Sequence, residues 1–264
     1  MEQKRKKKRV KILYHRVAAA VLVLVLLVSG GYLLWKHLDY QKGAEDYQAA
    51  VAAAGIPQWI KPPDRSGSSQ RSDPYASALA ETDLEALREV NPDVVGWIMI
   101  PDTVLSYPVV QGTDNRYYLN HTWMGERSGV GAIFMECTNT SGLSGFNTIL
   151  YGHRMNNESM FGVLKSYESM DFWKDHPTVY LVSDSGVHTY DIFAAHEVGI
   201  KEIVYRLDLE ESGLEQEFID FCLERSEIDT GVIPSAADKV LTLSTCTGRG
   251  HATRWVVQAV LREN

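Results

Sequence analysis

An unbroken apolar run near the N-terminus limits the architectures open to this chain. Nineteen consecutive residues, from Val17 to Trp35, carry no charged side chain. About 20 such residues span the hydrocarbon core of a bilayer as a helix. The run therefore predicts one transmembrane helix, with a short segment before it and a long one after it.

The charges that flank this run predict its orientation. The segment before it holds eight basic residues and a single acid, Glu2. Because basic flanks stay on the cytoplasmic side of a membrane, we expect a cytoplasmic N-terminus and an extracellular remainder. A cleaved signal peptide has the same basic start, but only Ser29-Gly30-Gly31 offers a weak cleavage site, and we interpret the run as an uncleaved anchor. The basic residues are Lys4, Arg5, Lys6, Lys7, Lys8, Arg9, Lys11 and Arg16.

The charge of the remaining chain argues against one class of partner. The full chain has 26 Lys and Arg against 34 Asp and Glu, and residues 17–264 keep 18 basic and 33 acidic residues, a net charge of −15. Such an acidic domain is unsuited to binding nucleic acid. The basic N-terminal cluster is better explained by attraction to anionic lipid, because the apolar run follows it directly.

A linker is expected between the apolar run and the folded domain. The Ala-rich stretch 39–54 predicts a helix that ends at Gly55 and Pro57. Residues 61–74 are turn formers and small polar residues, which cannot bury enough apolar surface to order themselves, and they predict a flexible stalk. The chain is thereby divided into a cytoplasmic tail (1–16), a transmembrane anchor (17–35), an extracellular stalk with a short helix (36–80) and a folded domain (81–264).

The folded domain is predicted to be mainly β with helices. A short helix over residues 83–90, capped by Thr82 with Glu85, precedes the strands. Two more helices, 159–167 and 209–225, interrupt them. Eight short strands suggest a closed barrel. The predicted strands are 96–100, 104–110, 131–135, 148–151, 178–182, 189–198, 240–245 and 254–261.

The three cysteines have different surroundings. Their odd number leaves at least one thiol unpaired in an extracellular chain. Cys222 recurs at helical spacing with Leu214 and Phe218, so we expect it in the core. Cys137 follows a predicted strand and is either a buried small side chain or the partner of Cys222 in one bridge. Cys246 is left over in both cases.

Cys246 is a candidate nucleophile. It lies at the C-terminal end of a predicted strand, where a rigid backbone can hold a side chain toward a substrate. A bare thiol has a pKa of roughly 8.5, so it needs a nearby cation to react readily at neutral pH. His153 lies 93 residues before it, and Arg254 lies eight residues after it across a turn that returns the chain as a hairpin. Arg249, within that turn, is a rival cation.

Each of these residues also has an ordinary structural explanation. Cys246 taken alone could be a buried strand cysteine, and His153 a surface or hydrogen-bonded core histidine. Arg254 alone is most often a charge at a strand edge. The case for chemistry therefore depends on the combination of the three and not on any one of them.

The combination resembles the signature of the sortases, cysteine transpeptidases of Gram-positive cell surfaces. Thr242-Leu243-Ser244-Thr245-Cys246, followed by Arg254 and preceded by Tyr151-Gly152-His153, carries the resemblance. Further segments are similar to class B of that family, and the resemblance spans about residues 83–261. These segments are Asn91-Pro92-Asp93-Val94-Val95-Gly96-Trp97-Ile98, Tyr107-Pro108-Val109-Val110-Gln111, Asp114-Asn115-Arg116-Tyr117-Tyr118-Leu119, and Tyr151-Gly152-His153-Arg154-Met155 ahead of Met160-Phe161.

The resemblance implies a fold and a mechanism. It implies a closed eight-stranded sortase barrel with N-terminal helices and a long helix between strands six and seven. Cys246 would attack a peptide carbonyl, Arg254 would stabilise the oxyanion or hold substrate carbonyls, and His153 would transfer the proton. No cofactor and no metal are implied.

Substrates and contacts are also implied by the resemblance. The donor would be a secreted protein with a C-terminal sorting pentapeptide of Asn/Ser-Pro-x-Thr-Gly/Asn type, cut after Thr. The acceptor would be an amine of the peptidoglycan cross-bridge or of its lipid-linked precursor. Asn115 and Ser244 match positions that contact the sorting peptide, and Tyr205 is a looser match. Thr247, where some relatives carry an acid, and the eight-residue spacing from Cys246 to Arg254 depart from the pattern and put the pentapeptide in doubt.

Other functions are weighed against this hypothesis. An L,D-transpeptidase expects His-Gly-Cys around its nucleophile, and a cell-wall cysteine peptidase usually places cysteine at a helix start before histidine. A pilin-polymerising enzyme or a non-enzymatic surface scaffold of the same fold stays open. A metal site is disfavoured, because Cys246 and His251 are five residues apart with no second ligand pair.

Overall fold

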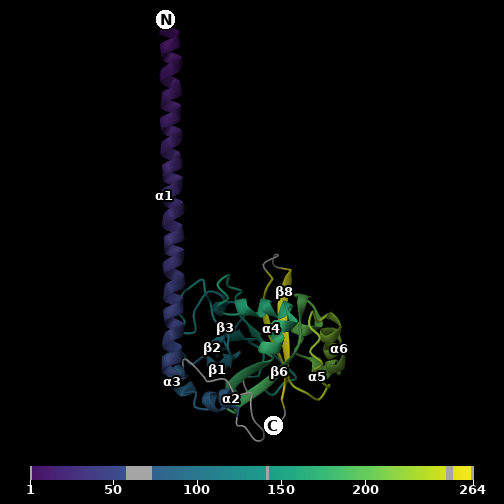
Figure 1. Ribbon diagram of the computed structural model, residues 1–264. Coiled ribbons are helices and arrows are strands. Elements are labelled where there is room, and N and C mark those ends of the chain that lie inside the picture. Colours follow the sequence, from purple (N-terminus) through teal and green to yellow (C-terminus); the bar gives the residue numbers. More distant parts are fainter. Residues whose placement is uncertain (1, 58–72, 141–142, 248–251, 263–264) are drawn as a thin grey trace. The chain divides into compact units, whose positions relative to one another are not determined.

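The structure is a computed structural model that describes residues 2–57, 73–140, 143–247 and 252–262. It divides into two units, residues 1–42 and residues 43–264. The stalk predicted at residues 61–74 and the turn that holds Arg249 lie almost entirely outside the described residues. Figure 1 shows the helices and strands.

The first unit belongs to the long helix α1, Glu2–Ala53. Its apolar side chains, among them Leu24, Leu27 and Leu33, are exposed. Among the described residues, this is the one helix long and apolar enough to cross a membrane, with a mean hydropathy of 2.3 in its most apolar window. A signal sequence near the N-terminus would meet the same criterion.

The last turns of α1 belong to the second unit and pack on it. Gly43, Tyr47, Ala50 and Ala54 are buried. Their spacing of four, three and four residues places them on one face of the helix. The helix expected over residues 39–54 is therefore the C-terminal part of α1, and one side of it is part of the barrel unit.

The second unit is a closed barrel of eight strands, as predicted. The strand order is β1-β2-β3-β4-β7-β8-β6-β5, and β1 pairs with β5 to close it. Two neighbouring pairs are parallel, β2 with β3 and β4 with β7. The strands are β1 Val94–Met99, β2 Ser106–Val110, β3 Ile133–Met135, β4 Asn147–Tyr151, β5 Thr178–Ser183, β6 Gly186–Gly199, β7 Val240–Cys246 and β8 Thr253–Leu261.

Helices occupy the connections, and three of the sequence-based expectations need correction. The first concerns the cap of α3, where the Asp83 carboxylate, not the Thr82 hydroxyl, accepts the backbone N–H of Ala86 at 2.9 Å. Thr82 instead donates to the Leu79 carbonyl. The helical elements after α1 are α2 Pro74–Leu79, α3 Leu84–Val90, η1 Tyr117–Leu119, η2 Gly162–Glu168, α4 Met170–Asp175, η3 Ile203–Tyr205, α5 Leu209–Ser212 and α6 Glu215–Arg225.

The second correction concerns the helix expected over residues 159–167, which is the 3₁₀-helix η2 and begins only at Gly162. Glu158 and Met160 have left-handed backbones, with φ of +65° and +55°. A right-handed helix cannot include such residues, so helical structure is delayed until after them.

The third correction concerns the long helix between the sixth and seventh strands. It is present but broken into α5 and α6, because Gly213 adopts a φ of +63° and ends α5. α6 packs against β6, and its buried face contains Phe218, Ile219 and Cys222. Figure 1 shows α5 and α6 on the outside of the barrel beside β6 and β8. Cys222 is thus a core residue, as expected, and all three cysteines are free thiols.

Candidate active site

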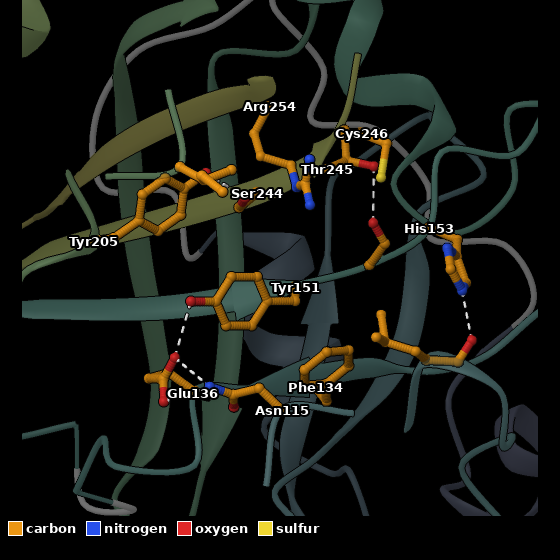
Figure 2. A pocket seen from close by; sticks show the side chains of 13 residues that line it. Asn115, Phe134, Glu136, Tyr151, His153, Tyr205, Ser244, Thr245, Cys246 and Arg254 are labelled. Carbon is orange, nitrogen blue, oxygen red and sulfur yellow. Dashed lines mark hydrogen bonds between the residues drawn. The ribbon is translucent and has the colours of Figure 1, made fainter. Parts of the chain in front are cut away.

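A cavity of about 380 Å³ opens where β4, β7 and β8 end on the barrel surface. Figure 2 shows that its side chains come from both sides of these strand ends and from the loops beside them. All six site residues expected from the sequence line it. The lining residues are Asn115, Leu119, Phe134, Glu136, Tyr151, Gly152, His153, Ile200, Tyr205, Ser244, Thr245, Cys246 and Arg254.

Two of these residues are neighbours across a strand pair. Cys246 is the last residue of β7 and lies directly opposite Arg254 on β8. Residues opposite each other in an antiparallel pair point to the same face of the sheet. The hairpin return expected from the sequence is therefore present. Arg249 lies in residues 248–251, outside the described part of the chain.

His153 reaches the same place through a parallel pair. Tyr151 on β4 is in register with Ser244 on β7, two residues before His153 and Cys246 respectively. The pairing continues past the strand end, since Gly152 N–H donates to the Ser244 carbonyl at 3.2 Å and the Thr245 hydroxyl donates to the Gly152 carbonyl at 2.8 Å. Parallel register thus brings together two residues that are far apart in sequence.

The His153 ring is held by one hydrogen bond. Its Nε2 lies 2.5 Å from the carbonyl oxygen of Leu119. A carbonyl only accepts hydrogen bonds, so Nε2 carries the hydrogen and Nδ1 is the nitrogen free to gain and lose a second proton. Figure 2 shows the ring turned toward this carbonyl, on the same side of the cavity as the Cys246 sulfur. Within the described residues, no hydrogen bond joins that sulfur to the ring.

A buried carboxylate organises the other end of the cavity. Glu136, directly after β3, accepts from Asn115 Nδ2 at 2.7 and 2.6 Å and from the Tyr151 hydroxyl at 2.9 Å. Its neighbours add the Thr138 hydroxyl at 3.2 Å and the Cys137 thiol at 3.4 Å. The Asn115 carbonyl oxygen accepts the Cys137 N–H at 2.9 Å, so the whole amide is fixed.

These contacts shift the ionisation of the groups involved. Burial alone would raise the pKa of Glu136, but the hydrogen bonds from Asn115 and Tyr151 outweigh it and hold the pKa below its usual value. Burial, with the Glu136 charge beside it, raises the pKa of the Tyr151 phenol. This end of the cavity is therefore a fixed anion surrounded by neutral donors.

Tyr205 and Ser244 form a second polar pair along the wall. The two hydroxyls are 2.9 Å apart. Burial raises the pKa of Tyr205 to about 12, against the opposing influence of Ser244 and the Arg254 charge. The Tyr205 phenol is thus a neutral hydrogen-bonding group at physiological pH.

The sequence analysis missed several residues of the site. Glu136 and Thr245 are in the cavity wall, and Arg154 Nη1 donates to the carbonyl of Thr247, the residue after Cys246. A glutamate between a buried strand and Cys137 was the available signal for Glu136, since a charge there needs several partners. Among the described residues, no three His, Cys, Asp or Glu side chains are grouped so as to hold a metal ion.

The fold and this cavity define a closed-barrel protein with a thiol, an imidazole and a guanidinium around one cleft. A protein-family model described as the Sortase domain matches residues 98–262. The chain belongs to the sortase family, and its relatives place it in class B. Enzymes of this family are transpeptidases with an active-site cysteine.

Two sequence relatives are the sortase B proteins of Staphylococcus aureus and Listeria monocytogenes. The first is 36% identical over 162 residues, which is 61% of this chain and 66% of that protein. The second is 35% identical over 164 residues, which is 62% of this chain and 67% of that protein. The matched segment thus spans about two thirds of each relative's length.

Solved structures give the same result. A Staphylococcus aureus sortase B–substrate complex aligns with a TM-score of 0.64 and 34% identity, over 68% of this chain and 84% of that one. A Bacillus anthracis sortase B in complex with AAEK2 aligns with a TM-score of 0.70 and 29% identity, over 85% of this chain and 98% of that one. The eight-stranded barrel with its added helices is the fold of these enzymes.

Proposed function

We propose that this chain is a membrane-anchored cysteine transpeptidase that cuts a C-terminal sorting peptide after Thr and transfers the protein to an amine. The observation that carries this proposal is the meeting of Cys246, Arg254 and His153 at one cavity from three different strand ends. A thiol, a permanent cation and an imidazole are the groups that acyl transfer through a thioester requires.

In the first step, the Cys246 thiolate attacks the carbonyl carbon of the substrate Thr. A carbon–sulfur bond forms and the carbon–nitrogen bond breaks. Arg254, which presents several fixed donors, stabilises the oxyanion that develops on the carbonyl oxygen. Protonated His153 gives its Nδ1 proton to the leaving amine, because Nε2 is engaged by Leu119.

In the second step, an acceptor amine attacks the thioester. Neutral His153 takes the proton of this amine, a new amide bond forms and the Cys246 thiolate leaves. The cycle returns both groups to their starting protonation states, so no cofactor is needed. Amine in place of water as the acceptor makes the enzyme a transpeptidase.

The cavity suits an extended peptide with its Thr near Cys246. Asn115, Tyr205 and Ser244 offer hydrogen-bonding groups along the wall, and we assign them to donor-peptide binding. One Staphylococcus aureus structure is titled as a sortase B–substrate complex and another as sortase B complexed with triglycine. By analogy, the donor is a secreted protein with an Asn/Ser-Pro-x-Thr-Gly/Asn signal. The acceptor is an amine of peptidoglycan or its lipid-linked precursor, with pilin polymerisation as the alternative.

The apolar part of α1 is assigned as an uncleaved anchor with the N-terminus in the cytoplasm, residues 36–80 as stalk and residues 81–264 as the extracellular catalytic domain. External protease should then release the barrel from intact protoplasts. Protection of the barrel, or its free secretion with an N-terminus near Gly31, would contradict this topology.

Replacement of the nucleophile tests the chemistry. Cys246→Ala should abolish both cleavage of a sorting-type peptide and trapping of a thioacyl adduct detected by mass spectrometry. Cys137→Ala and Cys222→Ala are the matched controls and should keep activity where folding survives. Turnover by Cys246→Ala would remove the central claim, and a wild-type enzyme that shows no labelling of Cys246 by thiol reagents would favour a non-enzymatic scaffold.

A further inference from the structure

The barrel-facing side of α1 packs beside the loop that leads to His153. Tyr47 is 7% exposed, and its hydroxyl donates to the Gly131 carbonyl at 2.6 Å. One residue earlier, the Asp46 carbonyl accepts the indole N–H of Trp123 at 2.8 Å. The last turns of α1 are thus hydrogen-bonded to residues 123 and 131, which belong to one loop between η1 and β3.

Gly131 lies directly against the His153 ring. Its φ is +65°, and a Cβ built on it would lie 2.8 Å from His153 Cδ2 and 2.9 Å from the carbonyl oxygens of Leu119 and Tyr118. The Leu119 carbonyl is the group that accepts from His153 Nε2. The backbone that Tyr47 holds therefore touches both the imidazole and its hydrogen-bond partner.

Tyr47 also contacts a second support of His153. Its ring meets the Tyr107 ring edge-on, with centroids 5.1 Å apart. The Tyr107 hydroxyl accepts the N–H of Met160 at 3.2 Å, and the next residue, Phe161, donates its N–H to the His153 carbonyl at 3.0 Å. One tyrosine thus bears on both the ring side and the backbone side of His153.

We propose that Tyr47 is a positioning residue for His153, acting through Gly131 and Tyr107. This inference rests on the proton-transfer role proposed for His153. Loss of the hydroxyl would leave the Gly131 carbonyl unpaired in a buried place, which favours a shift of that carbonyl and of the ring packed on it. Proton transfer is sensitive to such shifts, whereas the distant Asn115 end of the cavity would keep its contacts.

The test is Tyr47→Phe in the full-length chain in detergent, with Tyr167→Phe as the matched control. Tyr167 is also a fully buried tyrosine whose hydroxyl donates to a carbonyl, that of His176 at 2.7 Å, but it does not line the cavity. We expect Tyr47→Phe to lower kcat about 3- to 10-fold with KM for a sorting-type peptide nearly unchanged. Tyr167→Phe should lower Tm comparably and leave kcat unchanged.

A second readout separates this inference from the proposed function. The His153 resonances, assigned by their loss in His153→Ala and titrated by NMR, should shift in Tyr47→Phe and not in Tyr167→Phe. The inference fails if the two phenylalanine variants give the same kcat and the same His153 titration curve as the wild type. Absence of any transpeptidase activity in the wild type would instead overturn the proposed function, and the titration would still decide the role of Tyr47.

Discussion

The two ends of the cleft are built in opposite ways. At the Glu136 end, one carboxylate is the acceptor for Asn115, Tyr151, Thr138 and Cys137. At the other end, the described residues give the His153 ring one hydrogen bond and the Cys246 thiol none. A region that recognises a peptide gains from fixed groups, whereas a nucleophile and a proton carrier must stay available to substrate. The contrast separates a preorganised binding end from a reactive end.

The reactive end should be the more sensitive to a small chemical change. Arg254→Lys keeps the charge but removes the planar fork of donors, so we expect kcat/KM to fall on the order of 10² to 10³. Steady-state cleavage of a sorting-type peptide measures this. Near-wild-type rates for Arg254→Lys together with a collapse in Arg249→Ala would transfer the role to Arg249.

Acid should act on the protein away from the cleft first. His196 on β6 lies under α6, with its ring centroid 6.0 Å from that of Phe221. Burial lowers the pKa of His196 from 6.5 to about 4, although the Glu197 carbonyl opposes this. The unfolded chain therefore binds the proton more readily. Stability is fully present above pH 6.5 and is lost as pH falls toward 4, by up to about 3 kcal/mol.

Chemical denaturation at pH values across this window measures the loss, and His196→Gln should flatten it. Glu136 keeps its charge there, because its pKa lies below the ordinary value of 4.5. The KM for peptide should therefore change little while stability falls. A KM that rises in parallel with the loss of stability would show that the cleft and the α6 layer are not independent.

The binding end should respond through KM. Glu136→Gln replaces an acceptor by an amide whose NH₂ opposes the donors of Asn115 and Tyr151, so we expect KM to rise about 10-fold with kcat within about 2-fold. Glu136→Asp, which keeps the charge, should recover part of the loss. Glu81→Gln, at an exposed position, is the control. A fall in kcat at constant KM would contradict the separation of the two ends.

Much of the barrel was predictable because its signals are local. All eight strands were expected from β-type runs between turn residues, and each is present with small differences at its ends. The pairing of Cys246 with Arg254 also follows from local sequence, since a short turn between two strands returns the chain on itself. The helix over residues 209–225 failed at Gly213, where a left-handed backbone replaced the expected continuous pattern.

The remaining parts of the site depend on distant residues. His153 meets Cys246 only because β4 and β7 pair in parallel, and the residues alone, without the family resemblance, gave no reason for that pairing. The partners of Glu136 on Asn115 and Tyr151 come from 21 and 15 residues away. The buried face of Gly43, Tyr47, Ala50 and Ala54 was present in the sequence as a helical spacing, but its partner loop was not.

The sequence by itself determined the elements and the chemical groups: an apolar helix, eight strands, a thiol at a strand end and an arginine across the next turn. These follow from side-chain periodicity and backbone preferences that act over a few residues. The tertiary structure alone decided which end of the cleft is rigid and which is reactive. That difference depends on burial and on hydrogen bonds between segments far apart in the chain, and both exist only once the barrel has closed.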